Sequence, residues 1–500
     1  MPDTTEVDTN PKPTVIIVGA GLGGLMLAAL LERVDIPYLI IERATSFKPL
    51  GSAMSLGGQV LPVFTQLGIA EKYRAIAKPY TFSRGISETG KPLLKLDWSA
   101  TKDVYGYPNY IVARPQLYDL LLTQVPAHKI LLGKRVLTIS EDDERVKVQT
   151  SDNSVYEGDI LVGADGAYSA VRQRLYETLK QLDQLPKSDQ EDLPFNCTCL
   201  VGQTEPLDPE EFPQLKDTGY PFIFTLGREG RPYTWTNFTT IDNRICYVVF
   251  EHLDKSTSRA AQEQRFRHSE NSEWGPYAAL TMCDETRDFP IHYLGKDGAN
   301  LTMGYLYDRT PQDRISKVML EEKIFKTWHH SRTVLLGDAC HKLNPSAGQG
   351  AITAMHDAIV LANQIYALPT NTSQAIHKAF TEYQAERYPP AIEASRNSVL
   401  LSMVLSKGFM GRVALFVTQY IPDWLWRIFV RKMVHTRPAF GPLERQEYKE
   451  TVAPFVSPSE EKARRVFELR KSKAAAAAGG AAAGEVDVDA VESGASASAI

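Results

Sequence analysis

Near the N-terminus, the residues Gly19-Ala20-Gly21-Leu22-Gly23-Gly24 have the spacing G-x-G-x-x-G. Each glycine has its own task in such a turn. Gly19 allows the tight bend, Gly21 lets the backbone approach a pyrophosphate, and Gly24 lets a helix pack closely on a strand. The free N–H groups and the dipole of that helix attract the negative diphosphate. The pattern predicts a nucleotide-binding turn; the alternative is a glycine-rich loop without a ligand.

An acidic residue, Glu42, follows the next apolar segment, Tyr38–Ile41. Its carboxylate can accept hydrogen bonds from the hydroxyls of an adenosine ribose, and it would repel a 2′-phosphate there. Glu42 and its neighbour Arg43 are therefore predicted cofactor contacts. The site suits FAD or NAD rather than NADP.

A second stretch, residues 159–172, reads as a buried strand followed by Asp165, Gly166 and a helix. The strand delivers Asp165 to its carboxyl end, where open α/β sheets bind their ligands. Asp165 and Gly166 are predicted cofactor contacts on this ground. The alternative is an ordinary strand–turn–helix in which the aspartate caps the helix.

The third stretch, residues 334–358, again joins a strand to a glycine-rich turn and a helix. Asp338 at the strand end is placed to accept a hydrogen bond from a polyol hydroxyl. Gly348, Gly350 and Ala351 open a helix of small residues, whose N-terminus can approach an aromatic ring and stabilise negative charge on it. His341 has no partner at metal-ligand spacing, so no metal is predicted.

These residues need a sheet that holds three strand ends together. Strand, helix and strand fit within about 30 residues after Thr14, as in a βαβ unit. Between about 190 and 300 the pattern changes to short β runs, and Ile241-Asp242-Asn243 predicts a hairpin. The predicted fold class is α/β: a Rossmann-like FAD-binding domain with an inserted, mainly β substrate domain and a C-terminal helical region.

The predicted boundaries divide the chain into seven segments. Three belong to the FAD-binding domain, two to the substrate domain, and the last two are a helical region and an Ala/Gly-rich disordered tail. The FAD-binding domain comprises residues 12–80, 113–190 and 301–365, and the substrate domain comprises residues 81–112 and 191–300. The helical region spans residues 366–470, and the tail spans residues 471–500.

The three stretches, in this order, resemble those of flavin-dependent aromatic hydroxylases of the para-hydroxybenzoate hydroxylase type. Fungal members that resemble salicylate hydroxylases and indole-terpenoid epoxidases look most similar. The resemblance covers roughly residues 12–365 and implies FAD contacts at Glu42, Arg114, Asp338 and Ala351. It also implies that Ser55 touches the flavin, and that Asp165 serves both FAD and the nicotinamide cofactor.

Two departures from the family pattern stand out. Ile352 occupies a place where many relatives carry Asn, which removes a polar group near the flavin. The segment Phe195-Asn196-Cys197 replaces a pattern that often contains a functional Arg. No catalytic residue is transferred, and the catalytic group is left unknown.

The resemblance implies a monooxygenase that consumes NADPH or NADH. The nicotinamide binds transiently, because no second G-x-G-x-x-G follows Gly24. A flavin hydroperoxide would insert one atom of O2 into an aromatic or lipophilic small molecule by hydroxylation or epoxidation. An FAD-dependent oxidase or dehydrogenase is the alternative, and a non-catalytic nucleotide-binding scaffold a more distant one.

The substrate pocket is expected in the β region. Tyr220, Tyr233 and Trp235 are the candidates to line it, and Tyr233 and Trp235 share a strand face by their period of two. The alternative is that these aromatic residues pack a sheet.

Composition excludes other classes. The net charge is −5 and no basic stretch with interleaved aromatics occurs, so nucleic acid is not an expected partner. The five cysteines lack disulfide or zinc spacing and fit a cytoplasmic location.

The apolar stretch 399–430 is interrupted by Pro422 and Asp423, which argues against a spanning helix. It predicts either peripheral contact with a membrane or a helix pair covering the FAD domain.

Overall fold

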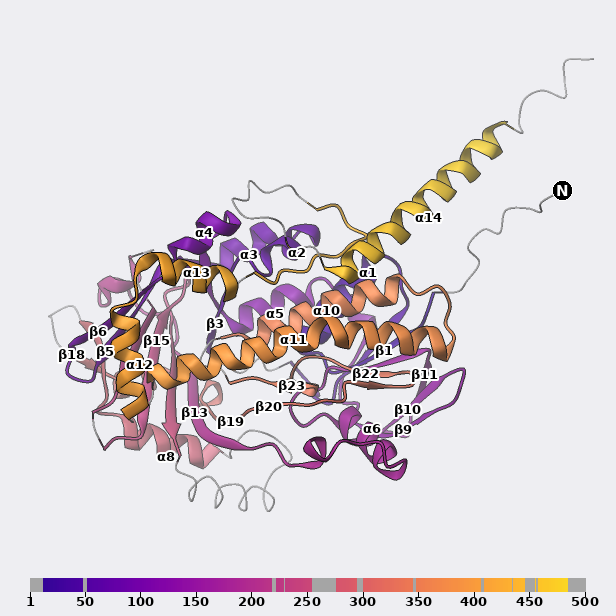
Figure 1. Cartoon of the computed structure of the whole chain (residues 1–500). Helices are drawn as coiled ribbons and strands as arrows, with labels where there is room; N and C mark the ends of the chain where they lie inside the picture. The colour runs from indigo at the N-terminus through magenta and orange to yellow at the C-terminus, as the bar shows by residue number, and fades with distance from the viewer. Residues whose placement is uncertain are drawn as a thin grey trace, which may run out of the picture.

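The computed structural model describes most of the chain, and Figure 1 shows how its elements are arranged. A mainly parallel sheet and its helices occupy one end of the molecule, and a mainly antiparallel sheet occupies the other. The long helix α11 (Ser373–Leu405) runs between the two ends. The described residues are 12–47, 52–217, 222–228, 230–253, 276–294, 300–344, 348–405, 409–433, 435–445, 455 and 457–483.

The first sheet has the strand order β21-β22-β12-β1-β2-β8. All neighbouring strands run parallel except β21 and β22. β1 and β12 are buried along their whole length, as expected for a parallel sheet with helices on both faces. In chain order the strands are β1 (Val15–Val18), β2 (Tyr38–Ile41), β8 (Ile130–Leu131), β12 (Ile160–Gly163), β21 (His329–His330) and β22 (Thr333–Leu335).

Helices follow three of these strands and carry the chain back across the sheet. α1 (Leu22–Glu32) follows β1 and packs against α10 (Gly350–Tyr366), which follows β22. α6 (Ala170–Gln181) follows β12. The predicted Rossmann-like unit is confirmed. The other short helices in the N-terminal part are α2 (Leu61–Gln66), α3 (Ala70–Ile76), α4 (Ser99–Tyr105) and α5 (Arg114–Leu122).

Small sheets flank the parallel sheet. One has the order β11-β10-β9 and the other the order β3-β7-β4; both are antiparallel. A two-stranded ribbon pairs β20 with β23. The strands are β3 (Ala53–Leu56), β4 (Ala77–Tyr80), β7 (Asn109–Ala113), β9 (Val136–Glu141), β10 (Val146–Thr150), β11 (Val155–Gly158), β20 (Lys323–Ile324) and β23 (His341–Lys342).

The second large sheet has the order β19-β13-β16-β15-β14-β5-β6. The predicted hairpin at residues 241–243 joins β15 to β16, and Asn243 adopts a positive φ of 59° there. β19 lies beyond the boundary predicted at residue 300, so this sheet extends further along the chain than the predicted substrate domain. We call it the substrate sheet after that prediction. The strands are β5 (Phe82–Ser87), β6 (Pro92–Asp97), β13 (Phe195–Gln203), β14 (Phe222–Leu226), β15 (Tyr233–Thr239), β16 (Ile245–His252) and β19 (Ser316–Glu321).

The two faces of this sheet bury different layers. One face, which includes Trp235, Tyr247 and Val249, packs in a hydrophobic cluster with α8 (Pro276–Thr286), β17 (Pro290–Leu294), β18 (Asn300–Thr302) and α9 (Met303–Tyr307). We call it the α8 face. Near β6, the opposite face packs against α13 through Phe224 and Trp426. We call this opposite face the inner face.

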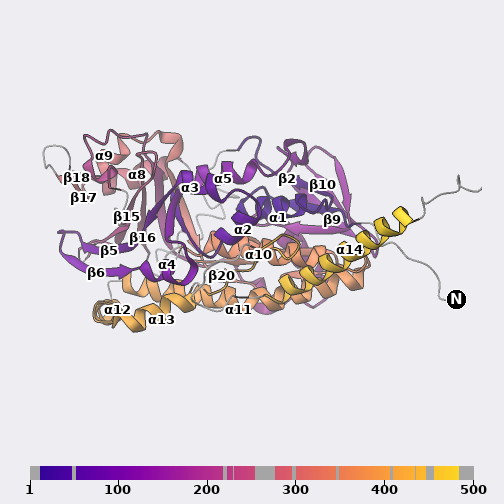
Figure 2. The same cartoon turned by 90° about the horizontal axis from the view of Figure 1, so that it is seen from above.

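The C-terminal region is helical, as predicted, but its placement differs from the expectation. α12 (Phe409–Gln419) and α13 (Asp423–Met433) cover the β5–β6 end of the substrate sheet and not the FAD unit (Figure 2). α14 (Pro458–Ala483) continues helically through residues 471–483, where disorder was predicted. Residues 484–500 lie outside the described residues. Among the described helices, none has the length and apolar character that crossing a membrane requires.

Candidate cofactor site

The glycine turn between β1 and α1 has the geometry that its spacing predicts. Gly19 has a φ of 105°, and a Cβ there would lie 2.4 Å from the carbonyl oxygen of Ala164. A Cβ at Gly24 would lie 2.1 Å from the oxygen of Gly19. Both glycines are therefore required by close packing of the backbone. Gly21 is the N-cap of α1, and a Cβ there would meet only the oxygen of Ala164, at 3.9 Å.

This difference matters for a ligand. Gly21 has no side chain that could accept a hydrogen bond from the first turn of α1. The first N–H groups of the helix are therefore available to a ligand. The space beside Gly21 lets a diphosphate approach those groups closely. The residues at this turn thus fit the pyrophosphate of a dinucleotide.

Glu42 stands at the end of β2, directly beside the glycine turn. Its two carboxylate oxygens accept hydrogen bonds from the backbone N–H groups of Ala20 and Ala44, each at 2.8 Å. The carboxylate is half-buried and held in place by these bonds, with lone pairs remaining for ribose hydroxyls. Arg43, the next residue, is exposed.

Asp338 lies in the short turn that follows β22 and forms an ion pair with Lys342, at 2.5 Å between Oδ2 and Nζ. Burial alone would raise the pKa of Asp338, but the nearby charges of Lys342, His341 and Arg114 lower it. Arg114, at the start of α5, and Asp338 are therefore brought together, although they are far apart in the sequence. Lys342 was missed by sequence reasoning, and its spacing of four residues from Asp338 was the available signal.

Asp165 follows β12 and is half-buried. One of its carboxylate oxygens accepts a hydrogen bond from the Ser169 hydroxyl at 2.5 Å, and the other from the N–H of Ala170 at 2.7 Å. Desolvation raises its pKa. These contacts serve the N-terminus of α6, which is the helix-capping arrangement left open as the alternative. Gly166 has a φ of 83° and supplies the turn.

The start of α10 is open where the third stretch predicts a ring. Cβ atoms added at Gly348 and Gly350 would meet no atom of the described residues within 4 Å, and Gly348 has a φ of 62°. Ala351 is half-buried against the core, whereas Ile352 is 4% exposed. The isoleucine that departs from the family pattern is therefore a core residue.

Ser55 lies in β3, and its hydroxyl is 2.7 Å from the Tyr80 hydroxyl. Lys78, on the same strand as Tyr80, donates a hydrogen bond to the Thr239 hydroxyl of the substrate sheet at 2.8 Å. Burial lowers the pKa of Lys78 to about 8. This lysine links the two units, and nothing in the sequence around it signalled the contact.

The aromatic residues expected to line the substrate pocket do not face the cofactor unit. Tyr233 and Trp235 share a face, as predicted, but it is the α8 face. Trp235 is fully buried and donates to the carbonyl of Pro290 at 2.7 Å, and Tyr233 donates to Glu285 at 2.9 Å. These contacts are those of the alternative, in which the two aromatic side chains pack the sheet. Tyr220 lies outside the described residues.

The inner face is the one turned toward the cofactor unit. Tyr168, beside the Asp165 turn, donates a hydrogen bond to Glu321 of β19. On this face, burial raises the pKa of Cys199 and Cys246, and the charge of Lys342 and a hydrogen bond with Ser52, next to β3, respectively oppose this rise. Cys199 and Cys246 are not on the α8 face, because they alternate with Leu200 and Tyr247, which are.

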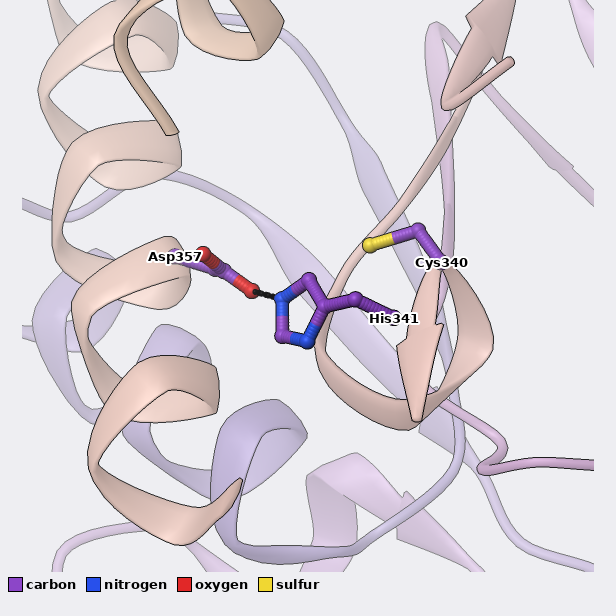
Figure 3. Close-up of side chains that lie close together, drawn as sticks. All are labelled: Cys340, His341 and Asp357. Atoms are coloured by element: carbon purple, nitrogen blue, oxygen red, sulfur yellow. Dashed lines mark hydrogen bonds and ion pairs between the residues drawn. The ribbon is translucent and has the colours of Figure 1, made fainter. Parts of the chain in front are cut away.

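A buried cluster of Cys340, His341 and Asp357 lies beneath the Asp338 turn (Figure 3). His341 Nε2 is 2.5 Å from Asp357 Oδ2, and Arg387 donates to Asp357 Oδ1 at 2.8 Å. The N–H of Gly337 donates to Asp357 Oδ2 at 3.0 Å. Burial raises the pKa of the Cys340 thiol well above its ordinary value. The guanidinium and the protonated thiol disfavour a cation there, so we interpret the cluster as a structural support for the turn.

Three strand ends, β1, β12 and β22, meet at one edge of the parallel sheet with a glycine turn and an acidic residue beside them. This fold and this edge define a dinucleotide-binding protein. Residues 12–195 and 306–398 match the family model described as FAD binding domain. The match covers more than half of the chain, which therefore belongs to this FAD-binding family and uses FAD as its cofactor.

Individual relatives extend the comparison. The chain is 28% identical to the FAD-dependent monooxygenase ctvC of Aspergillus terreus over 396 residues, covering 77% of each chain. It is 28% identical to the FAD-dependent monooxygenase paxM of Penicillium paxilli over 354 residues, covering 70% of this chain and 68% of that one. Klebsiella pneumoniae HpxO complexed with FAD and uric acid shares the fold, with a TM-score of 0.62 and 18% identity, covering 86% of this chain and 98% of that one.

Proposed function

We propose that this protein is an FAD-dependent monooxygenase that consumes NAD(P)H and inserts one atom of O2 into an aromatic or lipophilic small molecule. The observation that carries the proposal is the opposition of two surfaces. Tyr168, beside the Asp165 turn, donates a hydrogen bond to Glu321 of β19, and Lys78 donates one to Thr239 of β15. The FAD-binding edge therefore lies next to a separate, mainly antiparallel sheet. The relatives compared above are FAD-dependent monooxygenases.

In this proposal the cofactor spans the three stretches. The turn of Gly19, Gly21 and Gly24 takes the diphosphate, Glu42 takes the adenosine ribose, and Asp338 takes the ribityl chain. The flavin ring approaches the start of α10. The further contacts are Arg43, Ser55, Arg114, Asp165, Gly166, Gly348, Gly350 and Ala351.

The chemistry belongs to FAD when it is bound. Bound FAD would supply the redox and oxygen-transfer chemistry, with NAD(P)H as the reductant and O2 as the source of the inserted oxygen. The chain's own task is to hold the substrate, exclude water and stabilise negative charge on the ring. The N-terminus of α10 stabilises that charge through its free N–H groups and its dipole.

The inner face supplies the surface for a lipophilic substrate. Val201, Val248 and Phe238 lie on it, and all three are half-buried, whereas Leu200, Val249 and Trp235 on the α8 face are fully buried. Phe222 stacks on Phe238 with ring centroids 4.6 Å apart. Half-buried apolar side chains beside a cofactor edge are typical of a ligand site. We assign Val201, Phe222, Phe238 and Val248 to the substrate pocket in place of the aromatics of the α8 face.

The substrate is first identified by comparing the metabolites of cells with and without the protein. The purified yellow protein is then given NAD(P)H, this substrate and ¹⁸O₂, and the product is weighed by mass spectrometry. We expect a product carrying one labelled oxygen and consumption of one NAD(P)H for each product. An unlabelled product formed together with hydrogen peroxide would instead identify an oxidase, and a colourless protein would refute the FAD site.

A further inference from the structure

The outward-facing sides of α12 and α13 expose a group of large apolar side chains, which we call the outer patch. Phe416, Tyr420 and Trp424 are 62%, 67% and 64% exposed. Half of the fourteen large apolar side chains exposed by the described residues belong to this one helix pair. The members of the outer patch are Val413, Phe416, Val417, Tyr420, Trp424, Leu425 and Ile428.

The opposite side of the same helices is firmly packed. Trp426 is 8% exposed, packs edge-on against Trp98, and donates to the carbonyl of Asp97 at 2.5 Å. Val430 is fully buried in the same cluster. The helix pair is therefore anchored to the substrate sheet, and the outer patch is a feature of a fixed surface.

The spacing of the outer patch places it along continuous helix faces. Residues 413, 416 and 417 recur at three and four positions on α12, and Tyr420 follows directly after its end. Residues 424, 425 and 428 continue the pattern on α13. A helix pair that is apolar on both its inner and outer sides needs a second apolar environment. A contiguous exposed apolar surface of this kind marks a binding or membrane site.

The charge around the outer patch points to one kind of partner. Residues 409–433 contain four basic residues and one acidic residue, so their formal charge is +3 (4 − 1), in a chain whose net charge is −5. Arg431 and Lys432 are exposed in the last turn of α13, and Arg427 lies one turn earlier. Lys432 forms an exposed ion pair with Glu393 at 3.5 Å, and Arg427 forms one with Asp103 at 3.8 Å. Such exposed pairs are weak, so both cations can also interact with headgroups. A second copy of the chain would bring two such basic groups together, which Coulomb repulsion opposes.

We propose that the outer patch docks this protein on an anionic membrane surface. Phe416, Tyr420 and Trp424 insert into the boundary between headgroups and acyl chains, which aromatic side chains prefer. The basic residues of α13 contact anionic headgroups, each with a contribution that salt screens. The inner side of the same helices packs on the substrate sheet, so docking would bring a lipid surface next to that unit.

The test uses the full chain loaded with FAD. Sedimentation with vesicles of phosphatidylcholine, without and with added phosphatidylserine, measures the partition coefficient. We expect binding that phosphatidylserine strengthens and salt weakens. The triple variant Phe416→Ser, Tyr420→Ser, Trp424→Ser should bind at least about tenfold more weakly, because each aromatic side chain loses its buried area. The double variant Arg431→Glu, Lys432→Glu should lose the preference for phosphatidylserine.

Leu469→Ser is the matched control, because Leu469 is 61% exposed but lies on α14. This variant should bind vesicles like the parent. Flavin absorbance and melting temperature should be the same in all variants, since every replaced side chain is exposed. Absence of vesicle binding by the parent, or equal binding by the triple variant, overturns the proposal. The proposal is also overturned if the parent forms a dimer that the triple variant does not form, and neither protein binds vesicles.

Discussion

At the scale of single residues, the support beneath the cofactor turn depends on Asp357, a carboxylate with no solvent exposure. It receives a backbone N–H from Gly337 and a guanidinium N–H from Arg387, and it lies beside His341. Burial alone would raise its pKa, but His341 and Arg387 lower the pKa to about 2. The turn that carries Asp338 is thus fixed from below by a charged group.

Replacing Asp357 by Asn should destabilise the protein by about 3–5 kcal/mol at neutral pH, because Arg387 keeps a buried charge without its partner. The folded pKa of Asp357 lies below its unfolded pKa. The stabilisation is therefore complete above the unfolded pKa, near 4, and is lost as the pH falls toward 2. The melting temperatures of parent and variant should differ at pH 7 and converge below about pH 4. A constant difference over that range would contradict this role.

Asp338 gives the second prediction at this scale. The variant Asp338→Ala should bind FAD about 10- to 100-fold more weakly, the loss expected for a hydrogen bond to a charged group. Titration of the FAD-free protein with FAD, followed by flavin fluorescence, measures the change. Asp313→Ala is the control, because Asp313 lies in a 3-10 turn remote from this edge, and it should bind FAD normally. Unchanged affinity in Asp338→Ala would mean that the third stretch has been misinterpreted.

At the scale of elements, the sequence predicted most of the first sheet. β1, β12 and β22 are apolar runs followed within a few residues by glycine or aspartate, a strong local signal, and all three strand–turn–helix units are present. The failures came from packing. Period two correctly placed Tyr233 and Trp235 on one face, but it does not tell which face of a sheet meets another unit. Lys78 was missed because its partner, Thr239, is brought near only by folding.

The glycine turn allows structure and ligand binding to be separated. Gly24→Ala should destabilise the fold, because its Cβ would lie 2.1 Å from a backbone oxygen that cannot move away. Gly21→Ala meets nothing closer than 3.9 Å and should fold normally, yet its methyl group would occupy the space of the diphosphate. Thermal unfolding of the FAD-free proteins and FAD titration distinguish the two effects. A stable Gly24→Ala protein, or full FAD affinity in Gly21→Ala, would contradict the assignment.

At the scale of the whole molecule, the cofactor edge and the inner face are built by different parts of the chain and meet only in the folded protein. Their separation predicts that cofactor binding and substrate turnover can be changed independently. Val248, on the inner face, belongs to the substrate sheet and not to the FAD-binding edge. The α8 face provides controls within the same strands.

The variant Val248→Trp should fill the substrate pocket. We expect normal FAD content and at least a tenfold lower kcat/KM for the substrate, an effect of about 1.4 kcal/mol on the transition state. Tyr233→Phe is the control on the α8 face, and it should leave KM unchanged. Steady-state NAD(P)H oxidation and flavin absorbance provide the readouts. If kcat/KM fell only in the Tyr233 variant, the substrate pocket would instead lie on the α8 face.

The cofactor edge also sets an order of events during synthesis of the chain. β1 and β12 emerge from the ribosome early, but β22 and the start of α10 follow the entire substrate sheet, whose last strand is β19. A nascent chain that ends before Gly350 lacks the surface assigned to the flavin ring. FAD can therefore be captured only after the substrate sheet and the start of α10 have been synthesised. Released fragments that end before β22 should remain colourless in the presence of excess FAD.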